Sequence, residues 1–154
     1  TTKRTLRPLY LTALLAALLS ACKDSTAPLR DLDAIRVSVR VDPASVVVGQ
    51  TTSVVLTLRN STAYPVEISA CPIYFWVEGS GGEIVGGSNL LFCVKGTLVY
   101  QPLHFRPLES KTLTFIWLPG ETQTIPAGTY DVFGWVNEPD HHSAAAQVTV
   151  QPAP

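Results

Sequence analysis

The sequence IRVSVRVD, residues 35–42, decides the fold class of this chain. Its isoleucine and valines alternate with arginine, serine and aspartate, and this period of two places one set of side chains on each face of a β-strand. One face of such a strand packs on a core while the other meets water. The stretch therefore predicts a half-buried strand at the start of a β-domain.

The alternation returns along the rest of the chain, and no later segment shows the 3.6-residue period of a helix. Further strands are expected at residues 54–58, 66–68, 73–77, 113–117, 130–136 and 144–150. Turn signals rich in glycine and proline separate them, among them Asp42-Pro43, Gly86-Gly87 and Pro119-Gly120. The spacing predicts an all-β, immunoglobulin-like antiparallel β-sandwich of about seven to nine strands.

Two of these segments are rich in aromatic residues. Residues 73–77 (IYFWV) are apolar throughout and suit a strand in the middle of a sandwich. Their rings could stack on sugars, but in so apolar a run most of them are expected to fill the core. In residues 130–136 one face carries Tyr130, Val132, Gly134 and Val136, and the opposite face carries Phe133 and Trp135.

Tyr130 also stands where the chain enters the penultimate strand, after Ala127-Gly128-Thr129. A tyrosine at this place in immunoglobulin-like sandwiches often bonds back across the corner between strands. Tyr130 is placed to do so, and an ordinary tyrosine at the edge of the core is the alternative.

The first residues of the chain have the pattern of an export signal. Lys3, Arg4 and Arg7 precede an apolar run at residues 9–19, which is too short to span a membrane and ends in Leu-Ser-Ala-Cys at Cys22. This junction resembles the lipobox of bacterial lipoproteins. The resemblance implies lipid on the Cys22 thiol and cleavage before Cys22. An ordinary signal peptide or a short membrane helix that happens to contain a cysteine is the alternative.

The resemblance divides the chain into a signal peptide (residues 1–21), a polar tether (22–34), a sandwich domain (35–150) and a frayed tail (151–154). It implies a location in the bacterial cell envelope, anchored to the lipid bilayer through Cys22. Lys23 after the cysteine favours the outer membrane, facing the periplasm or the surface, in a cell that has one.

Removal of the signal also changes the charge. It lowers the basic residues from 11 to 8 against 12 acidic ones, a net charge of −4. No basic cluster remains for a phosphate backbone, so nucleic acid is not an expected partner.

The other two cysteines, Cys71 and Cys93, are then left as a pair in an oxidising compartment, which predicts a disulfide between them. The alternative is a pair of metal-ligating thiols, since His104 is the one histidine near them in sequence. No C-x-x-C spacing supports that alternative.

Several segments together resemble the intracellular proteinase inhibitor domain called BsuPI, an immunoglobulin-like sandwich, over residues 35–150. They are LRNS at 58–61, YPVEI at 64–68, the strand at 73–77, PLES at 107–110, the strand at 113–117 and AGTY at 127–130. The resemblance implies the sandwich fold and points to protease inhibition. The chain departs from the family in its export signal, in its glycine-rich residues 79–87, and in Leu108, where the family often has glycine.

Catalysis needs a base beside a nucleophile, a metal, or paired carboxylates. The chain has three histidines, His104, His141 and His142, and the last two follow Asp140 in what is expected to be a solvated turn. The carboxylates are scattered, mostly at strand ends or on outward positions such as Glu67. No G-x-S-x-G nucleophile elbow occurs in the sequence. The glycine-rich residues 79–82 are not a phosphate-binding motif, because they are expected to form a hairpin connection with no following helix. We expect no enzyme activity, no cofactor and no metal site.

Asn60-Ser61-Thr62 matches a glycosylation pattern, but a turn role for Asn60 is favoured. The function predicted from the sequence is a membrane-anchored extracytoplasmic lipoprotein. It acts as a non-enzymatic binding or accessory module for an unknown protein or glycan partner, with the loops at residues 79–87 or 119–126 as binding elements. The alternative is an inhibitor of an extracytoplasmic protease.

Overall fold

The computed structural model describes residues 31–69, 72–88, 102–121, 124–136 and 141–154. A 3-10 turn and ten strands are formed by these residues: η1 (Leu32–Ala34), β1 (Ile35–Asp42), β2 (Ser45–Val47), β3 (Thr52–Asn60), β4 (Val66–Ile68), β5 (Ile73–Glu78), β6 (Ile84–Gly87), β7 (Leu103–Phe105), β8 (Ser110–Trp117), β9 (Gly128–Val136) and β10 (Ala146–Gln151). The predicted strands are all present within a few residues of their predicted bounds. With the additional short strands β2, β6 and β7, the described residues form ten strands where about seven to nine were expected. No helix in the described part of the chain is long and apolar enough to cross a membrane.

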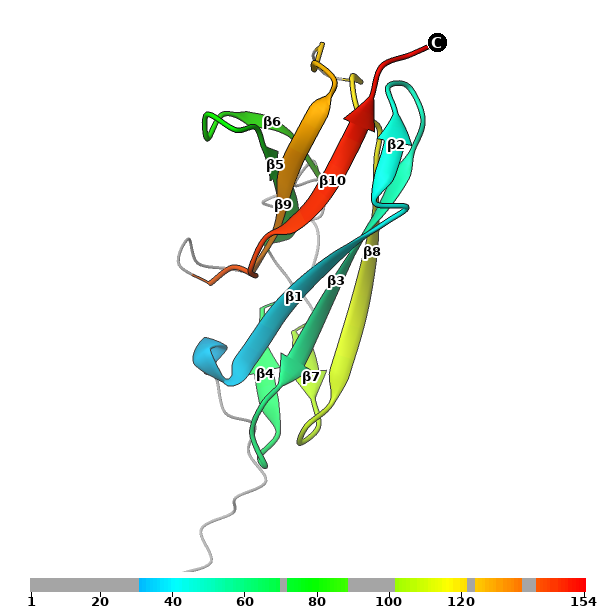
Figure 1. Ribbon diagram of the computed structural model, residues 1–154. Helices are drawn as coiled ribbons and strands as arrows, with labels where there is room; N and C mark the ends of the chain where they lie inside the picture. Colours follow the sequence, from blue (N-terminus) through cyan, green and yellow to red (C-terminus); the bar gives the residue numbers. More distant parts are fainter. Residues whose placement is uncertain (1–30, 70–71, 89–101, 122–123, 137–140) are drawn as a thin grey trace, which may run out of the picture.

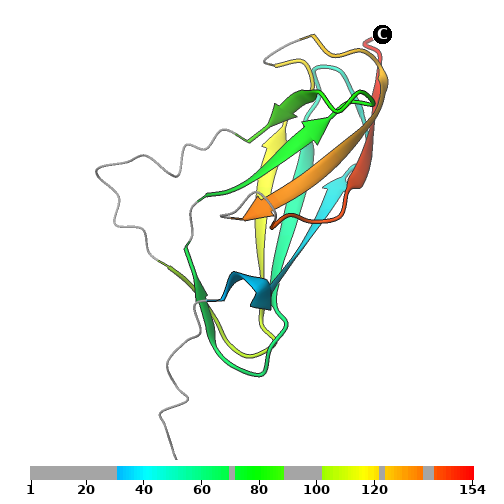
Figure 2. The ribbon, with the colours of Figure 1, turned by 90° about the vertical axis from the view of Figure 1, so that its left-hand side faces the viewer.

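The strands form two main sheets that pack face to face as an immunoglobulin-like β-sandwich (Figures 1 and 2). One sheet has three antiparallel strands in the order β1-β3-β8, and the other has five in the order β2-β10-β9-β5-β6. The short strands β4 and β7 pair separately, below the five-stranded sheet in Figure 1. The predicted fold class is confirmed.

The core lies between the inner faces of the two sheets. Leu56 of β3, Phe75 of β5 and Val132 of β9 have no exposed surface there. A second apolar cluster around Ile35, Leu58 and Phe105 closes the end of the sandwich beside β4 and β7. Burial of each such side chain stabilises the fold by about 1.5–3 kcal/mol, so the alternating apolar positions provide most of the driving force.

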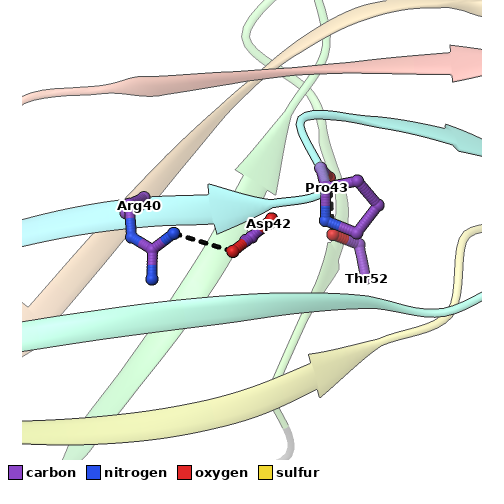
Figure 3. Close-up of polar contacts among 4 residues, drawn as sticks. All are labelled: Arg40, Asp42, Pro43 and Thr52. Atoms are coloured by element: carbon purple, nitrogen blue, oxygen red, sulfur yellow. Dashed lines mark hydrogen bonds and ion pairs between the residues drawn. The ribbon is translucent and has the colours of Figure 1, made fainter.

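The chain changes sheets between β1 and β2. β1 pairs with β3, but after the turn at Asp42 and Pro43 the next strand, β2, pairs with β10 in the other sheet. The Thr52 hydroxyl donates a 2.7 Å hydrogen bond to the Pro43 carbonyl and holds this turn against β3 (Figure 3). The β2–β10 pair is parallel, which corrects the expectation of a wholly antiparallel sandwich.

Both ends of the domain extend beyond the predicted bounds. Residues 32–34 were expected in the tether, but they form η1, and Ala34 is buried while its carbonyl accepts hydrogen bonds from the Ser61 amide and hydroxyl. Gln151 was expected in the frayed tail, but it pairs with Val47 in the parallel ladder. In both places backbone groups find partners far away in sequence, which a local pattern does not reveal.

The Tyr130 prediction is confirmed. Its side chain is buried, and its hydroxyl donates a 2.6 Å hydrogen bond to the Pro126 carbonyl across the corner before β9. Burial raises the pKa of the Tyr130 hydroxyl above its ordinary value, and the nearby Glu83 carboxylate raises it further. The neutral hydroxyl therefore stays available as the donor that fixes this corner.

Asn60 has the favoured turn role, and it is fully buried. Its amide nitrogen donates to the carbonyls of Tyr64 and Arg106, at 2.6 and 2.9 Å. Its amide oxygen accepts from the Thr62 amide and hydroxyl, at 2.9 and 2.8 Å. One side chain thus joins the end of β3 to the turn before β8, and every hydrogen-bonding group of the amide is satisfied.

That turn before β8 holds Leu108 in the left-handed region, with φ of 60° and the side chain exposed. This conformation is costly for a residue with a Cβ and favours glycine. The Glu109 carboxylate accepts a 2.6 Å hydrogen bond from the Arg106 amide and pairs with Lys111 at 3.3 Å. The amide hydrogen bond, more than the Lys111 charge, lowers the pKa of Glu109.

Candidate functional site

The outer face of the five-stranded sheet carries a cluster of four aromatic side chains. They are Tyr74 and Trp76 of β5 and Phe133 and Trp135 of β9, and we call them the aromatic face. Tyr74 lies directly opposite Trp135, and Trp76 directly opposite Phe133. The ring centroids of the two pairs are 4.2 and 5.1 Å apart, the first edge-on and the second stacked. All four side chains are half-buried, so part of each ring remains accessible.

This arrangement corrects the expectation that the rings of residues 73–77 mostly fill the core. Only Phe75 does so, while Tyr74 and Trp76 point outward. Because Phe75 and Val77 are buried, alternation places Tyr74 and Trp76 on the outer face. On the neighbouring strand β9, a Cβ at Gly134 would come within 2.7 Å of the Leu56 side chain. The core opposite Leu56 accepts no large residue from β9, and the alternation then places Phe133 and Trp135 outside.

Polar groups border the aromatic face. The Glu78 carboxylate accepts a hydrogen bond from the Trp76 indole nitrogen. Asp131, opposite Glu78 on β9, accepts from the Gln147 amide at 3.4 Å. Partial burial raises the pKa of the Tyr74 hydroxyl, which therefore stays protonated as a donor. A half-exposed apolar surface with hydrogen-bond donors and acceptors at its edge suits a ligand that makes both apolar contacts and hydrogen bonds.

The two consecutive histidines lie beside this face, and the expectation of a solvated turn is wrong for His141. Its Nε2 atom lies 2.7 Å from the Ile35 carbonyl and is therefore the protonated nitrogen that donates to it. His142 is exposed, but its ring packs edge-on against Trp76 and Phe133, with centroids 6.0 Å from each. The segment that leads into β10 thus connects the aromatic face to the start of β1.

A cleft opens at this connection, with a volume of about 510 Å³. Its lining residues come from η1, β1 and the histidine segment: Asp33, Ile35, Arg36, Val37, His141 and His142. The cleft contains groups of both charges beside hydrogen-bonding imidazoles. The candidate site therefore consists of the apolar aromatic face and this polar cleft beside it.

The sequence-predicted cysteine sites, Cys22, Cys71 and Cys93, all lie outside the described residues. The lipid attachment and the disulfide stay predictions. His104, the candidate partner of metal-ligating thiols, lies on β7 and pairs with Glu67 of β4 at 3.3 Å. The Glu67 side chain is only 16% exposed, so it is less outward than expected. Among the described residues, no group of three or more histidine, cysteine or acidic side chains is arranged to hold a metal.

The predicted binding loops lie only partly within the described residues. Residues 79–83 form the expected hairpin connection between β5 and β6, closed by a 2.9 Å hydrogen bond from the Gly79 amide to the Glu83 carbonyl. Ile84, at the end of this connection, is 66% exposed. Of the loop at residues 119–126, positions 122 and 123 lie outside the described residues. The sheet face, not an end loop, offers the largest group of accessible rings found in the described chain.

The fold and the site together define an immunoglobulin-like sandwich domain with an aromatic outer sheet face. No protein-family profile matches the chain, and no curated protein matches it in sequence. Similarity is found among solved structures. A β-glucosidase of Erythrobacter marinus, EmGH1, aligns with a TM-score of 0.51 at 11% identity over 76% of this chain and 15% of its own. The chain therefore spans a small part of that enzyme.

Two further structures are similar. The alkylpurine DNA glycosylase AlkC of Pseudomonas fluorescens aligns with a TM-score of 0.51 at 12% identity, over 77% of this chain and 30% of its own. The CARDB domain of the PF1109 protein from Pyrococcus furiosus aligns with a TM-score of 0.42 at 16% identity, over 75% and 91%. At these identities the likeness concerns the fold alone, and neither enzyme's activity transfers to this chain.

Proposed function

We propose that this chain is a non-enzymatic binding module of the bacterial cell envelope, anchored by lipid on Cys22, and that it binds saccharides on its aromatic face. The observation that carries the proposal is the cluster of Tyr74, Trp76, Phe133 and Trp135 on an outward sheet face. A sheet face that only meets water has no need of four adjacent aromatic side chains.

Saccharides suit this surface because a pyranose ring has apolar C–H faces and hydroxyl edges. The C–H faces contact the accessible parts of the indole and phenyl rings, which supply a large rigid area at little entropic cost. The hydroxyls meet the carboxylates of Glu78 and Asp131 and the imidazole of His142 at the border. A flat, open face of this kind fits the side of an extended chain of sugars.

The membrane anchor rests on the lipobox resemblance at Cys22. A lipid-anchored module would hold its ligand close to the envelope without a membrane-spanning helix. Cys22→Ser should lose partitioning into the detergent phase while the signal sequence remains. An unmodified Cys22 at a mature amino terminus, identified by mass spectrometry, would refute the anchor without touching the binding proposal.

The saccharide proposal is tested on a panel of immobilised oligosaccharides with the full-length chain in mild detergent. Trp76→Ala and Trp135→Ala should each weaken capture about fivefold to tenfold, because each ring contact contributes roughly 1 kcal/mol. Thr57→Ala is the matched control, since Thr57 occupies an outward position on the other sheet. Equal loss in all three variants, or capture of none of the saccharides, would overturn the proposal.

Protease inhibition, suggested by the resemblance to the BsuPI family, is the second candidate. The observation that favours it is Ile84, a large apolar side chain exposed beside a hydrogen-bonded hairpin. An inhibitor presents such a side chain to a protease pocket on a loop held in one conformation. Inhibition of an extracytoplasmic protease that disappears in Ile84→Asp, while Trp76→Ala still inhibits, would favour this candidate over saccharide binding.

A further inference from the structure

The cleft beside His142 is lined by one arginine that the domain itself does not use, and a second arginine lies directly beside that one. Arg36 lines the cleft from β1, and Arg59 lies directly opposite it on β3. Both side chains are exposed, and neither makes an ion pair or side-chain hydrogen bond with any residue in the described ranges. Like charges directly opposite one another destabilise a sheet, so the pair costs stability when nothing is bound.

An anion placed at this pair would remove the repulsion. Guanidinium groups bind carboxylate, sulfate and phosphate through two parallel hydrogen bonds, which makes arginine the most effective side chain for oxyanions. Asp33 is the one carboxylate lining the same cleft. Within the lining Asp33 balances the charge of Arg36, and Arg59 adds a second positive charge beside the cleft. The position of Asp33 gives a means of testing the sign of the electrostatic effect.

The cleft and the aromatic face share a residue. The His142 ring contacts Trp76 and Phe133 on one side and lines the cleft on the other. The neighbouring His141 fixes this segment to β1 through its hydrogen bond to the Ile35 carbonyl. His142 therefore lies between the aromatic face and the cleft.

We infer that the cleft is the subsite for a negatively charged group of the ligand, and that the ligand class is acidic saccharides. This inference rests on the proposed function, because the aromatic face must hold the sugar rings whose acidic group enters the cleft. The charged group is a carboxylate, sulfate or phosphate, which share the geometry that Arg36 recognises. A neutral saccharide uses the aromatic face alone.

The test compares oligosaccharides in matched acidic and neutral forms, titrated into the full-length chain in mild detergent. The pairs are galacturonan oligomers with their methyl esters, sulfated galactan oligomers with their desulfated forms, and phosphorylated mannan oligomers with their dephosphorylated forms. At least one acidic member should bind tighter than its neutral partner. Arg36→Gln should weaken binding of that member about tenfold and leave the neutral one unchanged.

Two variants control for general electrostatics. Asp33→Asn should strengthen binding of the acidic member, since it removes the opposing charge from the cleft. Arg40→Gln should have no effect, because Arg40 lies on the same strand and face but outside the cleft, paired with Asp42 at 2.8 Å. If Arg36→Gln and Arg40→Gln weaken binding equally, the effect is long-range attraction and the inference is wrong.

The remaining outcomes separate the inference from the proposed function. If acidic and neutral members bind equally and Trp76→Ala weakens both, saccharide binding stands and the charged subsite falls. Capture of no saccharide of either form overturns both. If inorganic sulfate or phosphate alone binds as tightly as the acidic saccharides, the cleft is an independent anion site and the inference is overturned.

Discussion

The outer faces of the two sheets follow the same alternation but carry different chemistry. On the three-stranded sheet the outward positions are mostly arginine, serine and threonine, which is what a solvent-facing sheet requires. On the five-stranded sheet the outward positions of β5 and β9 are Tyr74, Trp76, Phe133 and Trp135. Both sheets pack apolar side chains on their inner faces, so the core does not account for the difference.

Alternation specifies a sheet, whereas the composition of its outer face indicates its use. Removal of outward residues from the three-stranded sheet should change little. Removal of outward rings from the five-stranded sheet should cost some stability and most of the binding. The following variants test this separation, beginning with the largest expected effect.

The inward position of Gly134 gives the largest expected effect. Gly134→Val would force a branched side chain into Leu56 and should lower the free energy of unfolding by about 3 kcal/mol. Phe133→Val, one residue away on the outer face, should lower it by about 1 kcal/mol through lost ring contact. Urea unfolding measures both losses in free energy. A larger loss for Phe133→Val than for Gly134→Val would mean that Phe133, not Gly134, faces the core.

The turn that leads into β8 gives the next largest effect, which is a gain in stability. Leu108→Gly should raise the free energy of unfolding by about 1 kcal/mol, because glycine adopts the left-handed conformation without strain. The leucine side chain is 57% exposed, so the substitution removes little buried apolar surface. A lower melting temperature for the variant would contradict the conformation described for this turn.

Glu109 in the same turn predicts a pH dependence. Its pKa is lowered in the folded chain from the ordinary 4.5, so its contribution to stability is present above that value and is lost as the pH falls through the lowered pKa. Glu109→Gln should therefore be less stable than the natural chain at neutral pH, with the gap closing on acidification. A gap that is constant with pH would show that the carboxylate charge plays no part.

The smallest effect belongs to the ion pair on the outer face of the three-stranded sheet. Arg40 and Asp42 are 2.8 Å apart but both are largely exposed (Figure 3). Asp42→Asn should change the free energy of unfolding by less than about 0.5 kcal/mol, because water and salt screen such pairs. A larger loss in thermal unfolding would mean that this face contributes to the fold as much as the aromatic face does.

Much of the fold could be predicted from the sequence because alternation is local. It grouped Tyr130, Val132 and Gly134 on one face of β9 and Phe133 on the other, and the structure confirms this grouping. Alternation does not say which of two apolar faces is inward. That choice depends on Leu56, which is more than seventy residues earlier in the chain and fills the space opposite Gly134.

The site was harder to predict than the fold, for the same reason. The sequence showed the rings of residues 73–77 and of residues 130–136 but not that the two strands lie side by side, and only that pairing creates the aromatic face. The cleft depends on a contact between His141 and Ile35, which are distant in sequence. The conformational cost of Leu108 follows from a backbone angle that only the structure gives.

Tryptophan fluorescence tests the central claim most directly, because Trp76 and Trp135 lie on the aromatic face while Trp117 is buried in the core. Titration of the Trp117→Phe chain with a saccharide that binds should produce a saturable change in emission, with the same midpoint as binding measured by calorimetry. Trp76→Ala in the same background should reduce both the signal and the affinity. Binding at full affinity with no change in emission from either tryptophan would contradict the account.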